Sequence, residues 1–258
     1  MKFAWRALLL LMLSLTPSLA QAASIDEISA LYVRGDYEQA ARLGEASHTA
    51  PGLAMAARAV LAEEVLGDVP CLLCLQRAEK LSREAIAADP HFALAQVWLA
   101  VALGYESRIL GPIRARLKDT PNQSKAALLL ACQAEPGNAF AISALGGWNI
   151  EVVRAGGSFL ARHIYGATET EGLSLFDQAV KADPKNVAVH YQIALSLAGF
   201  DAGKYRARIA AEFQSALSGT PNTEYEKKIQ GRAGELLGLL GQGAVFDKRV
   251  RKYQGFPD

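Results

Sequence analysis

Two cysteines, three positions apart, are the residues of this sequence best placed to carry out chemistry. Cys71 and Cys74 enclose two leucines, and Cys132 is the third cysteine of the chain. In an oxidising compartment, a pair at this spacing forms a structural disulfide or a reversible redox pair. The sequence leaves four outcomes open: a disulfide at the start of a helix, two free thiols there, a pairing that involves Cys132, or thiol–disulfide exchange.

The residues around the pair favour a structural role. Residues 70–77 (P-C-L-L-C-L-Q-R) resemble a segment of membrane disulfide-generating oxidoreductases, which carry it at the end of a membrane helix beside a quinone. No such span accompanies the segment here, and no strand precedes it as in thioredoxin-like proteins. Leu75 replaces the histidine of a haem-attachment motif, and two further ligands for a zinc site are missing nearby. We therefore predict neither a metal nor a cofactor.

The other titratable residues show no catalytic pattern. The four histidines do not share a helical face at i, i+4 spacing. The sequence contains no G-x-S-x-G nucleophile motif, no phosphate-binding P-loop and no G-x-G-x-x-G dinucleotide motif. Carboxylates such as Glu63 and Glu64 are adjacent, so they point in different directions from a helix. We predict a protein that is not an enzyme.

Aromatic and charged residues gather around position 150 and suggest a binding surface. Trp148, Glu151 and Arg154 belong to one expected helix, and a bend is expected at Gly156-Gly157. Because Trp, Tyr and Arg are frequent anchors of protein interfaces, Trp148, Glu151, Arg154 and His190 are the candidate binding residues. The alternatives are that Trp148 belongs to the core and that His190 is a packing residue. Another set of arginines is an alternative for binding a carboxylate or a peptide terminus: Arg108, Arg114, Arg116, Arg206 and Arg208.

These residues require a scaffold of helices. Alanine-rich segments with helical periodicity dominate, and alternating runs of β-branched residues are missing. Proline cannot continue a helix and disfavours helical geometry in the residue before it. Four prolines follow alanine- or glycine-containing helix ends in this way: Pro90, Pro136, Pro184 and Pro221. We predict an all-α fold with helices over about 25–33, 36–48, 53–66, 72–88, 92–108, 123–134, 139–154, 169–182, 187–198, 204–218 and 223–240.

Small residues lie at a fixed distance before these prolines. Alanines stand five residues before the four prolines: Ala85, Ala131, Ala179 and Ala216. Bulky residues stand eight residues before the last three: Leu128, Phe176 and Phe213. A small side chain lets two helices approach closely, and a bulky one about a turn earlier fills the groove between units. The preceding helices carry matching large–small pairs, Leu145-Gly146 and Ile193-Ala194, so helical hairpins are expected to stack.

This pattern resembles the tetratricopeptide repeat, a helix-turn-helix unit with a period of roughly 34 residues. The proline spacings of 46, 48 and 37 residues are longer, which predicts central repeats expanded by a turn or a helix extension. Residues 35–40 (G-D-Y-E-Q-A) match the turn between the two helices of a repeat. The resemblance implies a tetratricopeptide-like α-solenoid with a concave groove.

Part of the chain resembles a narrower family, the regulators of microtubule dynamics. The resemblance rests on residues 145–152 (L-G-G-W-N-I-E-V), 164–167 (I-Y-G-A) and 176–179 (F-D-Q-A), and it covers about residues 75–220. Members of this family are tetratricopeptide-like and include bacterial proteins. The resemblance supports the fold and says little about the ligand, since an exported bacterial protein meets no microtubules.

The N-terminus has the features of a bacterial signal peptide. Lys2 and Arg6 precede an apolar run over residues 8–15 that is too short to span a bilayer, and small residues follow it. Cleavage is expected after Ala20, Ala22 or Ala23, and the alternative is an N-terminal membrane anchor. We therefore predict a signal peptide over 1–22, a helical repeat domain over 23–240, a C-terminal tail over 241–258, and a periplasmic or secreted location.

Charge narrows the classes of partner. Of the 27 basic residues, two lie in the predicted signal peptide, which leaves 25 against 26 acidic residues. With no basic block, we expect neither nucleic-acid binding nor electrostatic docking to an anionic membrane, and no stable membrane insertion after signal cleavage. The sequence predicts a non-catalytic scaffold or adaptor that binds a protein or peptide in its groove. The alternative is an accessory thiol–disulfide redox protein that uses Cys71 and Cys74.

Overall fold

The fold was obtained as a computed structural model, which describes residues 23–67 and 70–257. The predicted signal peptide, residues 1–22, lies outside the described residues. Within the described ranges the chain forms twelve α-helices and one short π-helix, with no strand. The predicted all-α class is confirmed.

The helices follow one another with short connections, and neighbours pack in pairs. In chain order they are α1 (Ile25–Arg34), α2 (Tyr37–Ala46), α3 (Ala50–Leu66), α4 (Leu72–Ala88), α5 (Ala93–Leu117), α6 (Thr120–Ala134), α7 (Ala139–Leu160), the π-helix η1 (Ala161–Tyr165), α8 (Glu169–Ala182), α9 (Val187–Asp201), α10 (Arg206–Ser218), α11 (Glu224–Leu239) and α12 (Ala244–Tyr253).

Several helices end just before a proline, and several begin at a polar capping residue. Helices α4, α6 and α8 end one residue before an acidic residue and its proline, as at Asp89-Pro90. Helices α7 and α9 then begin from a side-chain cap: the Asn138 side chain accepts a hydrogen bond from the N–H of Ala141, and Asn186 accepts one from that of Val189. Such caps satisfy backbone donors that lack an intrahelical partner.

The predicted close contacts between helices are present. The four alanines that precede the prolines are fully buried: Ala85, Ala131, Ala179 and Ala216, each 0 % exposed. The large–small pair at Leu145-Gly146 receives Phe176, since a Cβ on Gly146 would lie 2.7 Å from Cδ1 of that ring. Any larger residue at position 146 would therefore push α7 and α8 apart.

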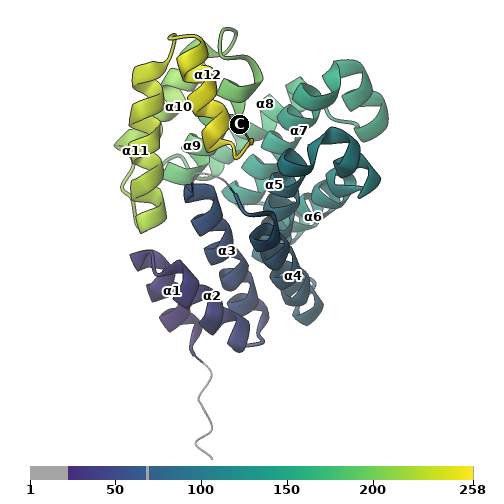
Figure 1. The fold of residues 1–258 in the computed structure, drawn as a ribbon, viewed down its shortest axis with the longest axis vertical. Helices are drawn as coiled ribbons and strands as arrows, with labels where there is room; N and C mark the ends of the chain where they lie inside the picture. The colour runs from purple at the N-terminus through teal and green to yellow at the C-terminus, as the bar shows by residue number, and fades with distance from the viewer. Residues whose placement is uncertain (1–22, 68–69, 258) are drawn as a thin grey trace, which may run out of the picture.

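The helix pairs wind around a common centre. Residues of α1, α3, α5, α7, α9 and α11 line one central cavity, to which α6 adds Ser124 and Leu128, so the odd-numbered helices form most of the inner layer. Their even-numbered partners pack mainly outside them, and Figure 1 shows α3, α5, α7 and α9 following one another around the middle of the molecule. This arrangement is that of a curved array of helical hairpins.

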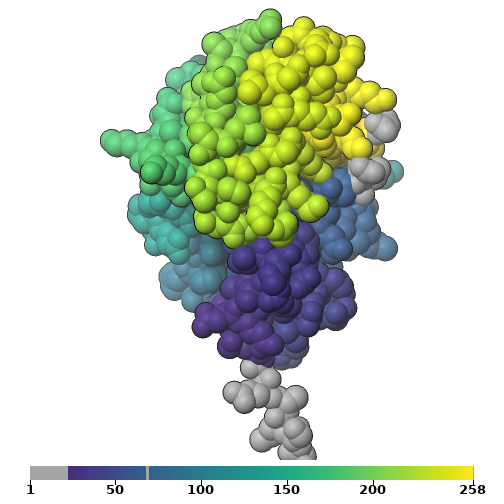
Figure 2. Space-filling model, turned by 90° about the vertical axis from the view of Figure 1, so that its left-hand side faces the viewer, coloured from purple at the N-terminus to yellow at the C-terminus, as the bar shows by residue number. Residues whose placement is uncertain are grey.

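The array closes on itself. Helix α11 contacts α1 and α3, and the C-terminal helices lie directly against the N-terminal ones in Figure 2. Arg232 of α11 donates to the carbonyl oxygens of Val65 and Leu66, at 2.8 and 2.7 Å. These carbonyls lie at the C-terminal end of α3, where backbone acceptors lack intrahelical donors and the helix dipole is negative. A cation is therefore well placed to join the first and last parts of the chain.

Three segments differ from the expected boundaries. Helices α5 and α7 run beyond the predicted residues 108 and 154, which agrees with the expectation of expanded central repeats. Each contains a glycine with positive φ, Gly111 at 77° and Gly157 at 74°, where the helix is kinked. The segment predicted as a tail contains α12, whose Phe246 and Val250 are buried. Among the described helices, none combines the length and apolar character needed to cross a membrane.

Arg232→Gln tests the closure of the array. The variant leaves two helix-terminal carbonyls without their charged donor, so the free energy of unfolding should fall by about 2–3 kcal/mol. Urea unfolding followed by circular dichroism measures the change. Arg42→Gln is the matched control, because the ion pair of Arg42 within the described residues is an exposed one with Glu38 on α2. This variant should change stability by less than about 0.5 kcal/mol. Equal stability of the two variants would contradict this role for Arg232.

Candidate functional site

The inner helices enclose a cavity of about 220 Å³. Six aromatic side chains from four of the helices contribute to its walls: Tyr32, Trp98, Tyr105, Phe140, Trp148 and Tyr225. Small residues of α3, α5 and α7 fill the positions between them, which keeps space open at the centre. On Gly104 of α5, for example, a Cβ would meet no atom within 4 Å. The cavity therefore offers aromatic faces to an apolar group.

Arg58 is a cation in this mostly apolar wall. Its guanidinium lies 4.2 Å from the ring centroid of Tyr32 and 5.4 Å from that of Trp98. No carboxylate of the described part of the chain lies within ion-pair distance of Arg58. The faces of aromatic rings attract a cation without neutralising it. Arg58 is thus positioned to bind an anionic group that enters the cavity.

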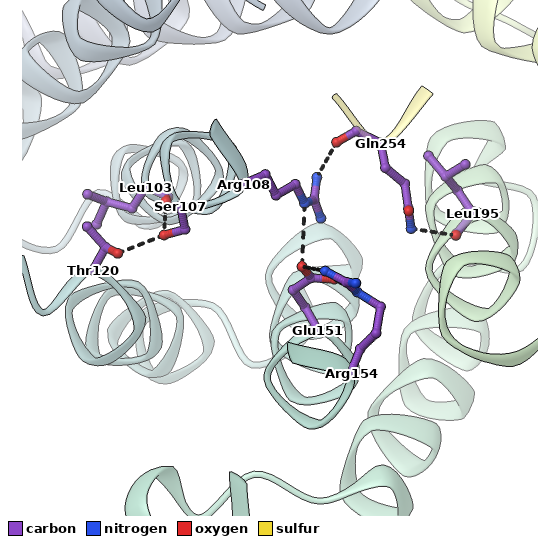
Figure 3. Close-up of polar contacts among 8 residues, drawn as sticks. All are labelled: Leu103, Ser107, Arg108, Thr120, Glu151, Arg154, Leu195 and Gln254. Atoms are coloured by element: carbon purple, nitrogen blue, oxygen red, sulfur yellow. Dashed lines mark hydrogen bonds and ion pairs between the residues drawn. The ribbon is translucent and has the colours of Figure 1, made fainter. Parts of the chain in front are cut away.

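A second arginine, Arg108, is held by the protein itself (Figure 3). Its Nη1 donates to the carbonyl oxygen of Gln254 at 2.9 Å, and its Nε lies 3.8 Å from Oε1 of Glu151. Arg154 donates from Nε and Nη2 to the two oxygens of the same carboxylate, at 2.9 and 2.7 Å. Burial alone would raise the pKa of Glu151, but the hydrogen bonds from Arg154 and the charge of Arg108 lower it. Glu151 is therefore an ionised link between two arginines.

The C-terminal residues lie across this part of the cavity. The side chain of Gln254 donates to the carbonyl oxygen of Leu195 on α9 at 3.0 Å (Figure 3). A Cβ on Gly199 would lie 2.1 Å from that amide nitrogen, so a side chain at position 199 would displace the amide of Gln254. The ring of Phe256 packs against the guanidiniums of Arg154 and Arg108, at 4.7 and 5.7 Å from its centroid. Gln254 and Phe256 are thereby fixed beside the Glu151 network.

The structure brings three of the four candidate binding residues together. Trp148 and Glu151 line the cavity, and Arg154 lies against Glu151. Trp148 is 8 % exposed, and its indole N–H donates to the carbonyl oxygen of Pro121 at 2.9 Å. Trp148 therefore belongs to the core as well as to the cavity wall.

His190 lies apart from the other three. It is 3 % exposed and does not line the cavity. Its Nδ1 lies 2.6 Å from Oε2 of Glu212, and its Nε2 lies 3.0 Å from the carbonyl oxygen of Pro184. The hydrogen bond to Glu212 outweighs burial and raises the pKa of His190. This environment agrees with the packing alternative for His190.

Of the alternative arginine set, Arg108 alone lines the cavity. Arg208 pairs with Asp177 and Glu212, and Arg206 reaches the carbonyl oxygen of Leu240. Sequence reasoning missed Arg58. A signal for it exists, because position 58 shares a helical face with Leu61, Ala62 and Val65 at i+3, i+4 and i+7. An arginine on an otherwise apolar face requires a specific environment.

The cysteine pair lies outside the cavity lining. Cys71 and Cys74 form a disulfide, and Cys132 is a free thiol. Cys71 is the N-cap of α4: its Sγ accepts from the N–H of Cys74 at 3.2 Å, and its own N–H donates to Oε2 of Glu64 at 2.6 Å. The sulfurs and this carboxylate oxygen lie within 4.8 Å of one another. A neighbouring carboxylate disfavours a thiolate, which weakens the case for a reactive pair.

A buried carboxyl group, Glu106, stands behind the cavity wall. It is 1 % exposed, and its neighbour is Glu79 of α4. Burial, then the hydrogen bond to Glu79 and the charge of Glu79, raises the pKa of Glu106 to about 7. Below that pH the carboxyl group of Glu106 is protonated, and a neutral group is tolerated inside the protein.

Comparison with known proteins assigns no family to this chain. No protein-family model matches the sequence, and no curated protein matches it. The cavity and the residues around it are therefore the grounds on which a function can be proposed.

Glu106→Gln should change how stability depends on pH. Folding raises the pKa of Glu106 from 4.5 to about 7. Its contribution to the free energy of unfolding is therefore fully present below about pH 4.5 and is lost as the pH rises through 7. A neutral amide removes this loss, so the variant should gain up to roughly 3 kcal/mol on the wild type between pH 5 and pH 8. Urea unfolding at the two pH values measures the gain.

The control for this experiment is Glu63→Gln, which makes the same substitution at an exposed position of α3. It should shift the stability equally at both pH values. The raised pKa of His190 also makes the folded state less stable as the pH rises. Wild type and variant share this effect, so it cancels when their stabilities are compared. A pH dependence unchanged by Glu106→Gln would show that Glu106 does not ionise in this range.

Proposed function

We propose that this protein is a non-catalytic binding protein of the tetratricopeptide type, which holds a segment of a protein or peptide partner in its central cavity. The recurring prolines, the buried alanines before them and the helix pairs support the repeat assignment. Repeats of this kind bind partners on the concave surface that their inner helices create. The N-terminal sequence supports export, so the partner is proposed to be periplasmic or secreted.

The observation that carries the proposal is Arg58 in its aromatic surroundings. Trp, Tyr and Arg at the centre of a desolvated pocket are the residues that contribute most to protein interfaces. A cation that already lies between Tyr32 and Trp98 needs little reorganisation to bind an anion. The proposed occupant is therefore an apolar side chain next to a carboxylate, either an acidic residue or a C-terminus.

The size of the cavity favours a peptide segment over a complete small molecule. Its volume of about 220 Å³ is below the roughly 300–1,000 Å³ of typical pockets for small molecules. Two carboxylates line the cavity, and both are engaged within the protein. Both oxygens of Glu151 accept hydrogen bonds from Arg154, and Glu226 accepts one from the N–H of Asn222, so proton transfer has little support. Binding a partner, unlike proton transfer, requires only the aromatic and charged side chains that line the cavity.

Blocking the cavity tests this proposal. Peptides are selected from a random library displayed on phage, and their affinities are measured by calorimetry. Gly104→Phe fills the open space of the cavity and should abolish binding, and Arg58→Gln should weaken it roughly 10- to 100-fold by removing a charged hydrogen bond. Amidation of a bound C-terminus, or an amide in place of a bound acidic side chain, should have the same effect as Arg58→Gln.

Gly238→Phe is the matched control, since a Cβ there also meets no atom within 4 Å but Gly238 lies outside the cavity lining. Circular dichroism should show that all three variants fold. Failure to select any peptide, or equal affinities for wild type and Gly104→Phe, would refute binding in the cavity.

A redox role for the cysteine pair is the second candidate. One observation favours it: Cys71 is exposed at the N-terminus of α4, where a helix dipole stabilises a thiolate. Equilibration with glutathione or thioredoxin buffers gives the reduction potential of the pair. With Glu64 nearby we expect a structural disulfide, below about −300 mV, and a potential of roughly −120 to −270 mV would instead support thiol exchange.

A further inference from the structure

The kinked ends of α5 and α7 expose apolar side chains that no element of the described ranges covers. In α5 beyond Gly111, Ile113 is 77 % exposed and Leu117 is 82 % exposed. After Gly157, Phe159 is 70 % exposed, Leu160 is 49 % exposed and Ile164 of η1 is 43 % exposed. These five residues, on two successive inner helices, are called here the kinked-end patch.

At both helix ends the bulky apolar face points to solvent, which is the reverse of an ordinary surface helix. Such a helix packs its bulky apolar face on the core and exposes polar residues. Here the residue that faces inward is an alanine, Ala115 at 4 % exposed in one end and Ala161 at 1 % exposed in the other. Ile113 and Leu117 lie four residues apart, as do Leu160 and Ile164, so each pair shares an outward face. In these exposed positions the apolar side chains contribute little to the stability of the folded chain.

The two ends lie beside one another on one edge of the molecule. In Figure 1 the far ends of α5 and α7 both project on the right-hand side. Helix α6 begins directly after α5 and connects the two ends, because Lys125 of α6 donates to the carbonyl oxygen of Tyr165 in η1 at 2.6 Å. This edge lies outside the cavity, so a partner bound there would leave the cavity free.

The charges around the kinked-end patch are mostly positive, and the exposed acidic residue beside it is Asp119, directly after Lys118. Residues 107–118 and 152–168 contain no Asp or Glu. Arg114, Arg116, Lys118 and Arg162 are exposed there, and no carboxylate of the described ranges lies within ion-pair distance of them. The near-zero charge of the whole chain conceals this local excess.

We propose that the kinked-end patch docks the protein on the surface of an anionic lipid bilayer. Exposed Phe, Leu and Ile side chains flanked by arginine and lysine are the composition that inserts into the headgroup region of a membrane. The apolar side chains enter the interface, and the basic side chains contact lipid phosphates. No helix has to cross the bilayer. A protein partner would be expected to supply a fitted pocket and carboxylates, and the same patch would then not bind lipid alone.

Binding to vesicles tests this docking. The chain is expressed from its whole sequence and used as isolated, with vesicles of equal parts phosphatidylglycerol and phosphatidylcholine or of phosphatidylcholine alone. Sedimentation should show binding to the anionic vesicles only, weakened by salt. Because each basic side chain accounts for roughly fivefold in affinity, Arg114→Gln/Arg116→Gln/Arg162→Gln should weaken binding roughly a hundredfold. Ile113→Ser/Leu117→Ser/Phe159→Ser should weaken it at least roughly tenfold.

The matched control is Leu73→Ser/Val245→Ser, which removes apolar side chains that are 75 % and 58 % exposed away from the patch and should leave binding unchanged. Wild type and variants share residues 1–22, so that segment contributes equally to all of them. Three results would overturn the proposal: no binding of the wild type to anionic vesicles, undiminished binding of both patch variants, or loss of self-association in the patch variants without loss of vesicle binding.

Discussion

Contact between the two ends of the helical array is the constraint on which the cavity depends. The inner helices enclose a space because α11 returns to α1 and α3, and Arg232 fixes this return through the carbonyl oxygens of Val65 and Leu66. Fully buried alanines such as Ala131 and Ala179 allow the tight packing that brings the last pair within reach of the first. An array with wider contacts would open into a shallow arc, and its aromatic wall would be lost.

Two arginines of the cavity show how surroundings decide what a charged group can do. Arg108 contacts the carbonyl oxygen of Gln254 and the carboxylate of Glu151, so its charge is already paired within the protein. Arg58 has aromatic faces in place of an acidic partner, so its charge stays available. The same side chain is structural in one case and suited to recognition in the other.

Local rules predicted much of the fold, and long-range contacts account for what they missed. Alanines five residues before a proline correctly predicted helical hairpins, because such packing depends on neighbouring units alone. Arg108 and Gln254, by contrast, are 146 residues apart, and nothing in the segment predicted as a tail indicated that it folds against the cavity. Trp148 and Glu151 were predicted and lie in the wall, whereas Arg58 was missed and His190 is bound by Glu212. The kink at Gly157 was expected from two adjacent glycines, and the one at Gly111 was not.

Closure also changes how such an array comes apart. An open solenoid has two terminal units, each held by one neighbour, and it can unravel from either end. Here α1 contacts α11 as well as α2 and α3, so neither end is held by a single neighbour. The whole array is therefore expected to unfold in one cooperative step. During synthesis, the first unit cannot make all its contacts until the last helices have been synthesised.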